Sequence, residues 1–337
     1  MNLAFLGQGL IESLGGLQLW PPAVALLLPL IFGLLLAPFG FGLLARFGLG
    51  QRVRVGGPEE HHAKEGTPTA GGLIVIALIL VTVFLIDRRR ELLPVLAALA
   101  LGAGFGLVDD LATLRSVGVA ARGLMARQRI IVQLAIGGAL GFWFMAIHAD
   151  TQTLPLLGAW RMGWLIVPVA ALALAATANA FNLTDGSDGL APGVMVIVVV
   201  VLALMARNLH QVALVRLLLA TAGALLAFLV YNLPPARVFL GGVGSEGIGM
   251  MIAAASISLG LVWLLPLLAL VPVLETLSVI IQVASFKTRG RRAFRMAPLH
   301  HHFQVGGWNE WTVALAGWAA SLAAGTIGLL LTREALS

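Results

Sequence analysis

Long runs of apolar residues dominate the chain and alternate with short connections rich in polar residues, Gly or Pro. About 20 apolar residues in a helix are enough to cross a bilayer, and in lipid the backbone polar groups of such a run must pair within the helix. The pattern therefore predicts an all-α polytopic membrane protein with about ten transmembrane helices. The predicted spans are residues 22–45, 68–87, 92–108, 130–148, 162–180, 190–206, 211–231, 243–264, 266–286 and 310–332.

Five connections between the spans are polar enough to carry functional groups. No soluble segment interrupts the spans, so residues 1–337 are predicted to form a single integral-membrane domain. Because consecutive spans alternate in direction, all five connections are expected on one side of the membrane. They are residues 46–67, 109–129, 182–189, 232–242 and 287–309.

The distribution of positive charge indicates on which side of the membrane the five connections lie. The five connections hold 14 of the 21 Lys and Arg residues, and loops rich in these residues stay in the cytoplasm. We therefore expect the functional site at the cytoplasmic face and both termini in the periplasm. The run Arg88-Arg89-Arg90 falls on the opposite side and does not follow the rule.

Composition supports the membrane class and excludes others. Hydrophobic residues make up 59% of the chain and charged residues 11%, against about 25% charged residues in soluble domains. The net charge of +6 is attributed to cytoplasmic loops beside anionic lipid, so no nucleic-acid partner is expected. The absence of cysteine excludes disulfides and a thiol nucleophile. The N-terminus lacks the pattern of a removable signal peptide.

The 15 acidic residues are few enough to weigh singly. Asp109 and Asp110 follow the span 92–108 in the sequence GLVDD, and an ionisable group at membrane depth usually faces a cavity or a partner. Adjacent helical residues point about 100° apart, so one carboxylate can face a cavity while the other orients a neighbour. A solvated acidic helix end is the alternative interpretation.

The segment NAFNLTDGSDGLA concentrates Asn179, Asn182, Asp185 and Asp188 between two spans. Asn and Asp stabilise turns through their own backbone, so a tight turn is one interpretation. The density of hard oxygen ligands also suits Mg²⁺ bound together with a substrate phosphate. A calcium-binding EF-hand is excluded, because the twelfth position counted from Asp185 is Val196 rather than Glu.

Two further segments carry cationic or titratable groups. Lys64 and Thr67 lie in KEGTPTAGG, where the lysine offers a mobile cation for phosphate, although a loop before a helix would look similar. His300, His301 and His302 follow a basic run. Three consecutive histidines cannot all bind one ion, so hydrogen bonding to phosphates or proton transfer near neutral pH is the better interpretation.

One apparent motif is set aside. The sequence GVGSEG at 242–247 matches the dinucleotide pattern G-x-G-x-x-G. That pattern has meaning only between a strand and a helix of a βαβ unit, which this chain is not expected to contain, so it does not predict NAD binding.

Taken together, the motifs resemble the phospho-N-acetylmuramoyl-pentapeptide transferase family. The HHH segment favours this family over relatives that transfer N-acetylglucosamine-phosphate. The matching segments, in order from about residue 60 to 305, are KEGTPTAGG, GLVDD, NAFNLTDGSDGLA, NLPPARVFLGGVGS, LETLSVIIQ and FRMAPLHHHF.

The resemblance implies a ten-helix homodimer in the bacterial inner membrane with a Mg²⁺-dependent site. Such enzymes join UDP-N-acetylmuramoyl-pentapeptide to undecaprenyl phosphate, giving UMP and lipid I for peptidoglycan synthesis. The resemblance implies catalytic roles for Asp109, Asp110 and His300. It implies substrate binding by Lys64, Thr67, Asn179, Asp185, Asp188, Asn232, Phe239, His301 and His302. It places Asn182 at a metal-binding position.

One departure from the family concerns this metal. The family has an Asp that binds Mg²⁺ where this chain has Gly242, and loss of a carboxylate should weaken metal binding. Glu246 stands four residues further on, where the family has an apolar residue. Positions four apart share one helix face, so we hypothesise that Glu246 reaches back and partly replaces the missing ligand.

Three functions therefore remain open at this point. The favoured one is an active transferase. The second is a homologue that binds substrate but turns over weakly or not at all, which Gly242 motivates. The third is a transporter, whose polar groups should lie near the membrane midplane rather than at the loop ends where this sequence places them.

Overall fold

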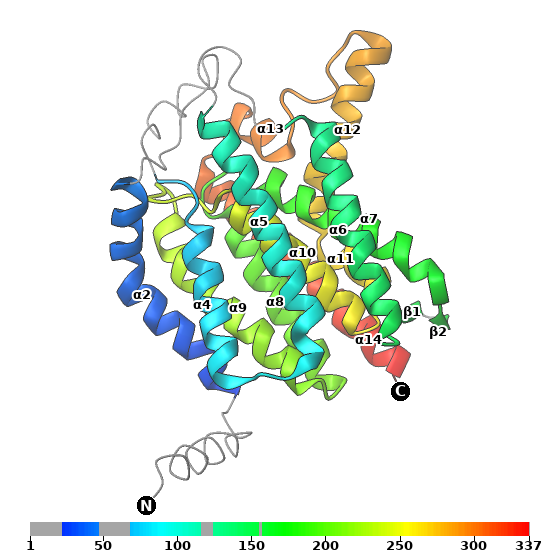
Figure 1. Ribbon diagram of the computed structural model, residues 1–337. Coiled ribbons are helices and arrows are strands. Elements are labelled where there is room, and N and C mark those ends of the chain that lie inside the picture. The colour runs from blue at the N-terminus through cyan, green and yellow to red at the C-terminus, as the bar shows by residue number, and fades with distance from the viewer. Residues whose placement is uncertain (1–21, 47–67, 116–123, 155–156, 337) are drawn as a thin grey trace, which may run out of the picture.

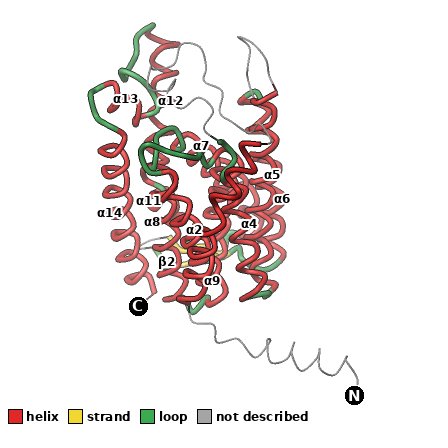
Figure 2. The backbone as a smooth tube through the Cα atoms, turned by 90° about the vertical axis from the view of Figure 1, so that its left-hand side faces the viewer, coloured by secondary structure: helices red, strands yellow, loops and turns green. Residues whose placement is uncertain are grey.

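The computed structural model describes residues 22–46, 68–115, 124–154 and 157–336. Its long helices run side by side in one bundle (Figures 1 and 2). The short helix α13 (Leu299–Val305) lies at one end of the bundle, at the top in both views. The C-terminal end of α14 (Glu310–Leu336) lies at the other end.

Helices form because the apolar runs can satisfy their backbone only internally. The remaining long helices are α2 (Pro22–Arg46), α4 (Gly72–Ile86), α5 (Leu93–Arg115), α6 (Ala126–Ala146), α7 (Ile166–Thr184), α8 (Leu190–Asn208), α9 (Val212–Asn232), α10 (Gly241–Ser258) and α12 (Leu270–Arg289). The short elements are η1 (Arg90–Leu92), η2 (Gly163–Leu165), η3 (Val262–Leu264), α11 (Leu265–Leu268), β1 (Thr151–Leu154) and β2 (Gly158–Arg161).

Eight helices in the described part of the chain are long and apolar enough to cross a membrane, and α4 is a shorter apolar helix. This confirms the predicted class of a helical polytopic membrane protein. Every predicted span overlaps a helix of the structure. The exact count of ten spans and the periplasmic position of both termini stay predictions.

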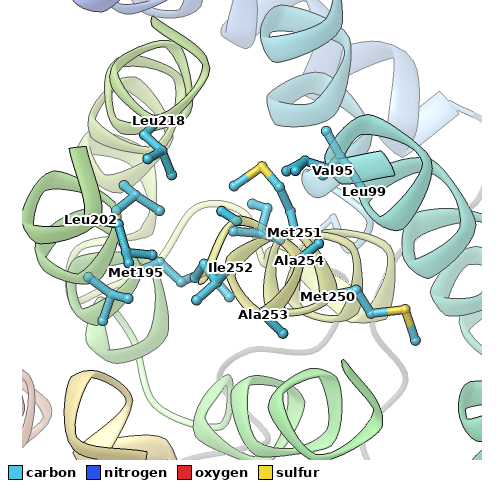
Figure 3. Close-up of a cluster of buried hydrophobic side chains, with 14 of the residues drawn as sticks. Val95, Leu99, Met195, Leu202, Leu218, Met250, Met251, Ile252, Ala253 and Ala254 are labelled. Atoms are coloured by element: carbon cyan, nitrogen blue, oxygen red, sulfur yellow. The ribbon is translucent and has the colours of Figure 1, made fainter. Parts of the chain in front are cut away.

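Helix α10 is the central element of the bundle. Figure 3 shows its Met250, Met251 and Ile252 surrounded by side chains of α5, α8 and α9. Glycine allows the neighbours to come this close: a Cβ on Gly72 of α4 would lie 2.4 Å from the Cα of Gly244. The amino ends of α4 and α10 are therefore in direct contact, and Gly106 likewise lets the carboxyl-terminal part of α5 lie against the backbone of Gly242.

Two predicted boundaries are corrected. The span 92–108 continues to Arg115, about two turns further, so Asp109 and Asp110 lie inside α5 rather than after it. The span 266–286 is divided at Ala269 into α11 and α12. Pro272 in the first turn of α12 has no N–H with which to continue a helix from α11.

The all-α expectation needs one addition, an antiparallel hairpin of β1 and β2. Its buried Gln152 donates to the carbonyl of Ile257 at 3.0 Å, and its Oε1 accepts the N–H of Val262 at 3.1 Å. These bonds satisfy backbone groups where α10 ends, which explains why a short polar segment is ordered here.

Candidate active site

A polar cavity of about 250 Å³ lies at the end of the bundle where α5 and α7 end and α10 begins. It brings together residues that are far apart in the sequence. Its lining includes six predicted site residues: Asp110, Asn182, Asp185, Asn232, Phe239 and His301. Thr69, Gly186, Ser187, Gly241 and Gly242 complete the lining. Lys64 and Thr67 lie outside the described residues.

Two predicted binding residues tie the α7–α8 connection to the α9–α10 connection. Asp188 accepts the N–H of Ala236 at 2.8 Å. Asn232 accepts the N–H of Gly189 at 3.0 Å and donates to the carbonyl of Val238 at 2.8 Å. Both side chains are almost fully buried, and they fix the shape of the cavity wall by satisfying backbone groups of both loops.

Asp185 lies just beyond the end of α7 and accepts the N–H of Gly241 at 3.2 Å. Burial raises the pKa of the Asp185 carboxyl well above its ordinary value, and the nearby Asp110 carboxylate raises it further, against the opposing hydrogen bond from Gly241. Two carboxylates in one cavity repel each other unless a cation lies between them. The cavity is therefore suited to a positively charged ligand.

Asp109 and Asp110 are adjacent on α5 but have different partners. Oδ1 and Oδ2 of Asp110 accept the N–H groups of Gly242 and Val243, each at 3.1 Å. Oδ2 of Asp109 lies 3.2 Å from Nη1 of Arg129. Asp110 therefore faces the cavity and the start of α10, whereas Asp109 holds α6.

Glu246 lies beside the cavity lining and has close partners. Its side chain is 0% exposed, and Arg129 donates to Oε1 at 2.6 Å while Gln133 donates to Oε2 at 2.8 Å. Asn182 donates to Oε1 at 3.4 Å, and Asn179 donates to Gln133. Arg129 and Gln133 were not predicted as site residues, although their spacing of four residues places both on one face of α6.

The three histidines occupy different environments. His300 is 1% exposed, and its Nε2 lies 2.5 Å from where a Cβ on Gly186 would stand. Its Nδ1 is 3.3 Å from Oε2 of Glu275 on α12. His301 lines the cavity, whereas His302 is not part of the lining. The catalytic role of His300 stays a prediction.

The cavity offers the oxygen donors that Mg²⁺ prefers, namely two carboxylates and an amide carbonyl. No cluster of three or more His, Cys, Asp or Glu side chains that could enclose a metal occurs among the residues the structure describes. The donor set fits a hard cation that keeps part of its coordination for substrate phosphate oxygens.

An apolar groove of about 490 Å³ runs between α7, η3, α11 and α12. Val169, Ala176 and Ala180 line it from α7, and Leu277 lines it from α12. Ala180 stands only two residues before Asn182, which lines the polar cavity. The same helix therefore borders an apolar groove and a polar site.

Comparison with known proteins gives one consistent result. A sequence profile of glycosyl transferase family 4 matches residues 92–260. The phospho-N-acetylmuramoyl-pentapeptide-transferase of Moorella thermoacetica is 42% identical over 312 residues, covering 91% of this chain and 97% of the relative. The proteins of the same description from Clostridium perfringens and a Geobacillus species are 40% identical over 290 residues and 38% identical over 321 residues.

The matches to the Clostridium and Geobacillus proteins cover 85% and 91% of this chain. They cover 89% and 97% of those relatives. The chain belongs to the phospho-N-acetylmuramoyl-pentapeptide transferase family, within glycosyl transferase family 4.

Proposed function

We propose that this protein transfers phospho-N-acetylmuramoyl-pentapeptide from its UDP-linked form to undecaprenyl phosphate and releases UMP. The observation that carries the proposal is the pairing of an oxygen-rich cavity with an apolar groove along α7. Such a pairing suits a reaction between one water-soluble phosphate ester and one lipid phosphate. A transporter is less well supported, because the polar cavity lies at an end of the bundle rather than near its middle.

In the reaction an oxygen of the lipid phosphate attacks the sugar-bound phosphorus of the nucleotide-sugar. One phosphoanhydride bond forms and the bond to UMP breaks, so no ATP is required. Mg²⁺ would neutralise phosphate charge during this exchange. We propose that Asn182 and a carboxylate bind this ion. The sequence pattern suggests Glu246 as the carboxylate, because it stands four residues after Gly242.

The acidic pair and the cavity walls orient the two substrates. Asp109 or Asp110 accepts the proton of the lipid phosphate where it is protonated. His300 contributes to catalysis. The residues that bind or orient the nucleotide-sugar are Lys64, Thr67, Asn179, Asp185, Asp188, Asn232, Phe239, His301 and His302. The polyprenyl chain lies in the groove between α7 and α12, where its apolar surface leaves water.

We also propose that the protein is a homodimer of the bacterial inner membrane. The cavity then opens to the cytoplasm, because most Lys and Arg residues lie in connections at that end. In this orientation the nucleotide-sugar can enter the cavity directly from the cytoplasm.

The test is release of UMP by the purified full-length protein in detergent. UDP-N-acetylmuramoyl-pentapeptide and undecaprenyl phosphate are supplied singly and together across a Mg²⁺ titration. We expect release only with both substrates and with Mg²⁺. Release without the lipid phosphate would contradict a transfer reaction. Substrate binding without release would instead identify the weakly active or inactive homologue that Gly242 suggests.

A further inference from the structure

Glu246 is the one charged residue in the sequence of α10, and its side chain is fully buried. It stands at a position where the family has an apolar residue, so the reaction common to the family does not require it. A buried carboxylate is costly unless its charge and its hydrogen bonds are compensated. The partners of Glu246 therefore indicate what it does in this chain.

The two carboxylate oxygens of Glu246 accept hydrogen bonds from different donors. Oε1 accepts from Nη2 of Arg129 at 2.6 Å and from Nδ2 of Asn182 at 3.4 Å. Oε2 accepts from Nε2 of Gln133 at 2.8 Å. Gln133 in turn accepts a hydrogen bond from the amide of Asn179. Asn179 and Asn182 are three residues apart on α7 and share one helix face, so this network holds both amides.

These contacts leave Glu246 poorly placed to bind a cation itself. Its side chain is not part of the cavity lining. Binding an ion would draw the carboxylate away from the guanidinium of Arg129, and separating a buried ion pair is costly. The contacts of Glu246 therefore do not support the ligand role that its spacing from Gly242 suggests.

The contact with Glu246 instead determines which way the amide of Asn182 is turned. A carboxylate accepts hydrogen bonds and does not donate them, so the amide nitrogen of Asn182 is the atom that faces Glu246. The amide oxygen accepts the hydroxyl of Ser245 at 3.3 Å and keeps a second lone pair. Because Asn182 lines the polar cavity, this oxygen is the atom left to bind a cation there. An amide turned the other way would present N–H groups, which cannot bind a cation.

We propose that Glu246 is a positioning residue, which holds the amide oxygen of Asn182 available to the cavity and strengthens cation binding without touching the ion. The inference rests on the proposed function, in which Asn182 binds Mg²⁺. Groups that hydrogen-bond to a metal ligand fix its orientation, and removing one commonly lowers metal affinity by about 10- to 100-fold. Glu246 is suited to this role because Arg129 and Gln133 hold its own carboxylate in place.

The test is Mn²⁺ binding to the detergent-purified full-length protein, followed by electron paramagnetic resonance with Mn²⁺ alone and with added UMP. Glu246→Leu removes both acceptor oxygens, and we expect Mn²⁺ affinity to fall roughly tenfold. Glu246→Gln loses the charge but keeps a carbonyl that can accept from Asn182, so it should retain most of the affinity. A direct ligand role for Glu246 predicts instead that both variants lose affinity alike.

A change at Asn182 separates positioning from a general effect on the fold. In Asn182→Asp both side-chain oxygens are acceptors, so the side chain no longer needs to be turned one way. We therefore expect Glu246→Leu to cause no loss of Mn²⁺ affinity in the Asn182→Asp background, although it causes one in the unmodified protein. Thermal unfolding of each variant checks that the fold is retained.

The variant Arg129→Leu/Glu246→Leu provides a second measurement. It removes both charges of the buried pair, so no guanidinium is left without Glu246. If Glu246 acted only through stability, this double variant would recover Mn²⁺ affinity. Because the double variant still lacks the acceptor for Asn182, we expect its affinity to stay as low as that of Glu246→Leu.

Four results would overturn the inference. They are unchanged Mn²⁺ affinity in Glu246→Leu, an equal loss in Glu246→Gln, an equal loss from Glu246→Leu with and without Asn182→Asp, and recovered affinity in Arg129→Leu/Glu246→Leu. Absence of Mn²⁺ binding to the unmodified protein, with and without UMP, also overturns it. Failure of the proposed function is seen separately, as no UMP release despite the expected pattern of Mn²⁺ binding.

Discussion

Glu275 is a residue of α12 that helps to position the histidine segment. Both of its carboxylate oxygens accept the backbone N–H of His300, each at 3.2 Å. This N–H belongs to the first turn of α13 and has no partner within the helix. Glu275 therefore fixes the start of α13, and through it the direction in which His301 enters the cavity.

We predict that Glu275→Ala lowers the rate of UMP release at saturating substrate by roughly 10- to 100-fold, because small misplacements in an active site have effects of this size. Glu275→Gln keeps an acceptor for the N–H of His300 and should lose much less activity. Equal rates for Glu275→Ala and the unmodified protein would show that the position of α13 does not matter for transfer.

At the scale of elements, the guanidinium of Arg129 on α6 contacts carboxylates of both α5 and α10. Arg129 lies 3.2 Å from Asp109 and 2.6 Å from Glu246. Gln133, one turn further along α6, donates to the second oxygen of Glu246. This network lies where α5, α6 and α10 meet, beside the cavity lining, and its buried charges are compensated only when all members are present.

Removing one member of this network should therefore be costly. Arg129→Ala leaves the Glu246 charge buried without its partner, and we expect a loss of about 3–5 kcal/mol in stability. The double variant Arg129→Leu/Glu246→Leu removes both charges and should lose much less. Thermal unfolding in detergent measures both. A double variant less stable than Arg129→Ala would refute the role of charge compensation.

For the whole molecule, buried charge is concentrated at the two ends of the bundle. The active-site carboxylates lie at one end, and Asp87, where α4 ends, lies near the other (Figure 1). Nη1 of Arg216 on α9 is 3.0 Å from Oδ2 of Asp87, and both side chains are buried. This ion pair links α4 to α9 far from the cavity.

We predict that Asp87→Ala lowers the unfolding temperature, because it leaves the buried Arg216 guanidinium without this carboxylate. The KM values for both substrates should not change, since Asp87 is not part of the cavity lining. Parallel unfolding and UMP-release measurements test this separation. A raised KM with an unchanged unfolding temperature would contradict it.

The sequence predicted the helices well because hydropathy is a property of local segments. Boundaries were predicted less well where side chains find partners elsewhere in the fold. Asp109 and Asp110 were expected to follow a span, but α5 continues through them. Their carboxylates are satisfied by Arg129 and by the start of α10, so the helix does not need to end at the membrane surface.

The sequence by itself determined the membrane class, the family resemblance and the set of polar residues from which the site is built, because these depend on composition and on short motifs. Only the tertiary structure decided which carboxylate faces which partner. Asp110 turns to the cavity, Asp109 to Arg129, and Glu246 to Arg129 and Gln133. The reason is that each partner lies on a different helix, and a local pattern carries no information about how helices pack.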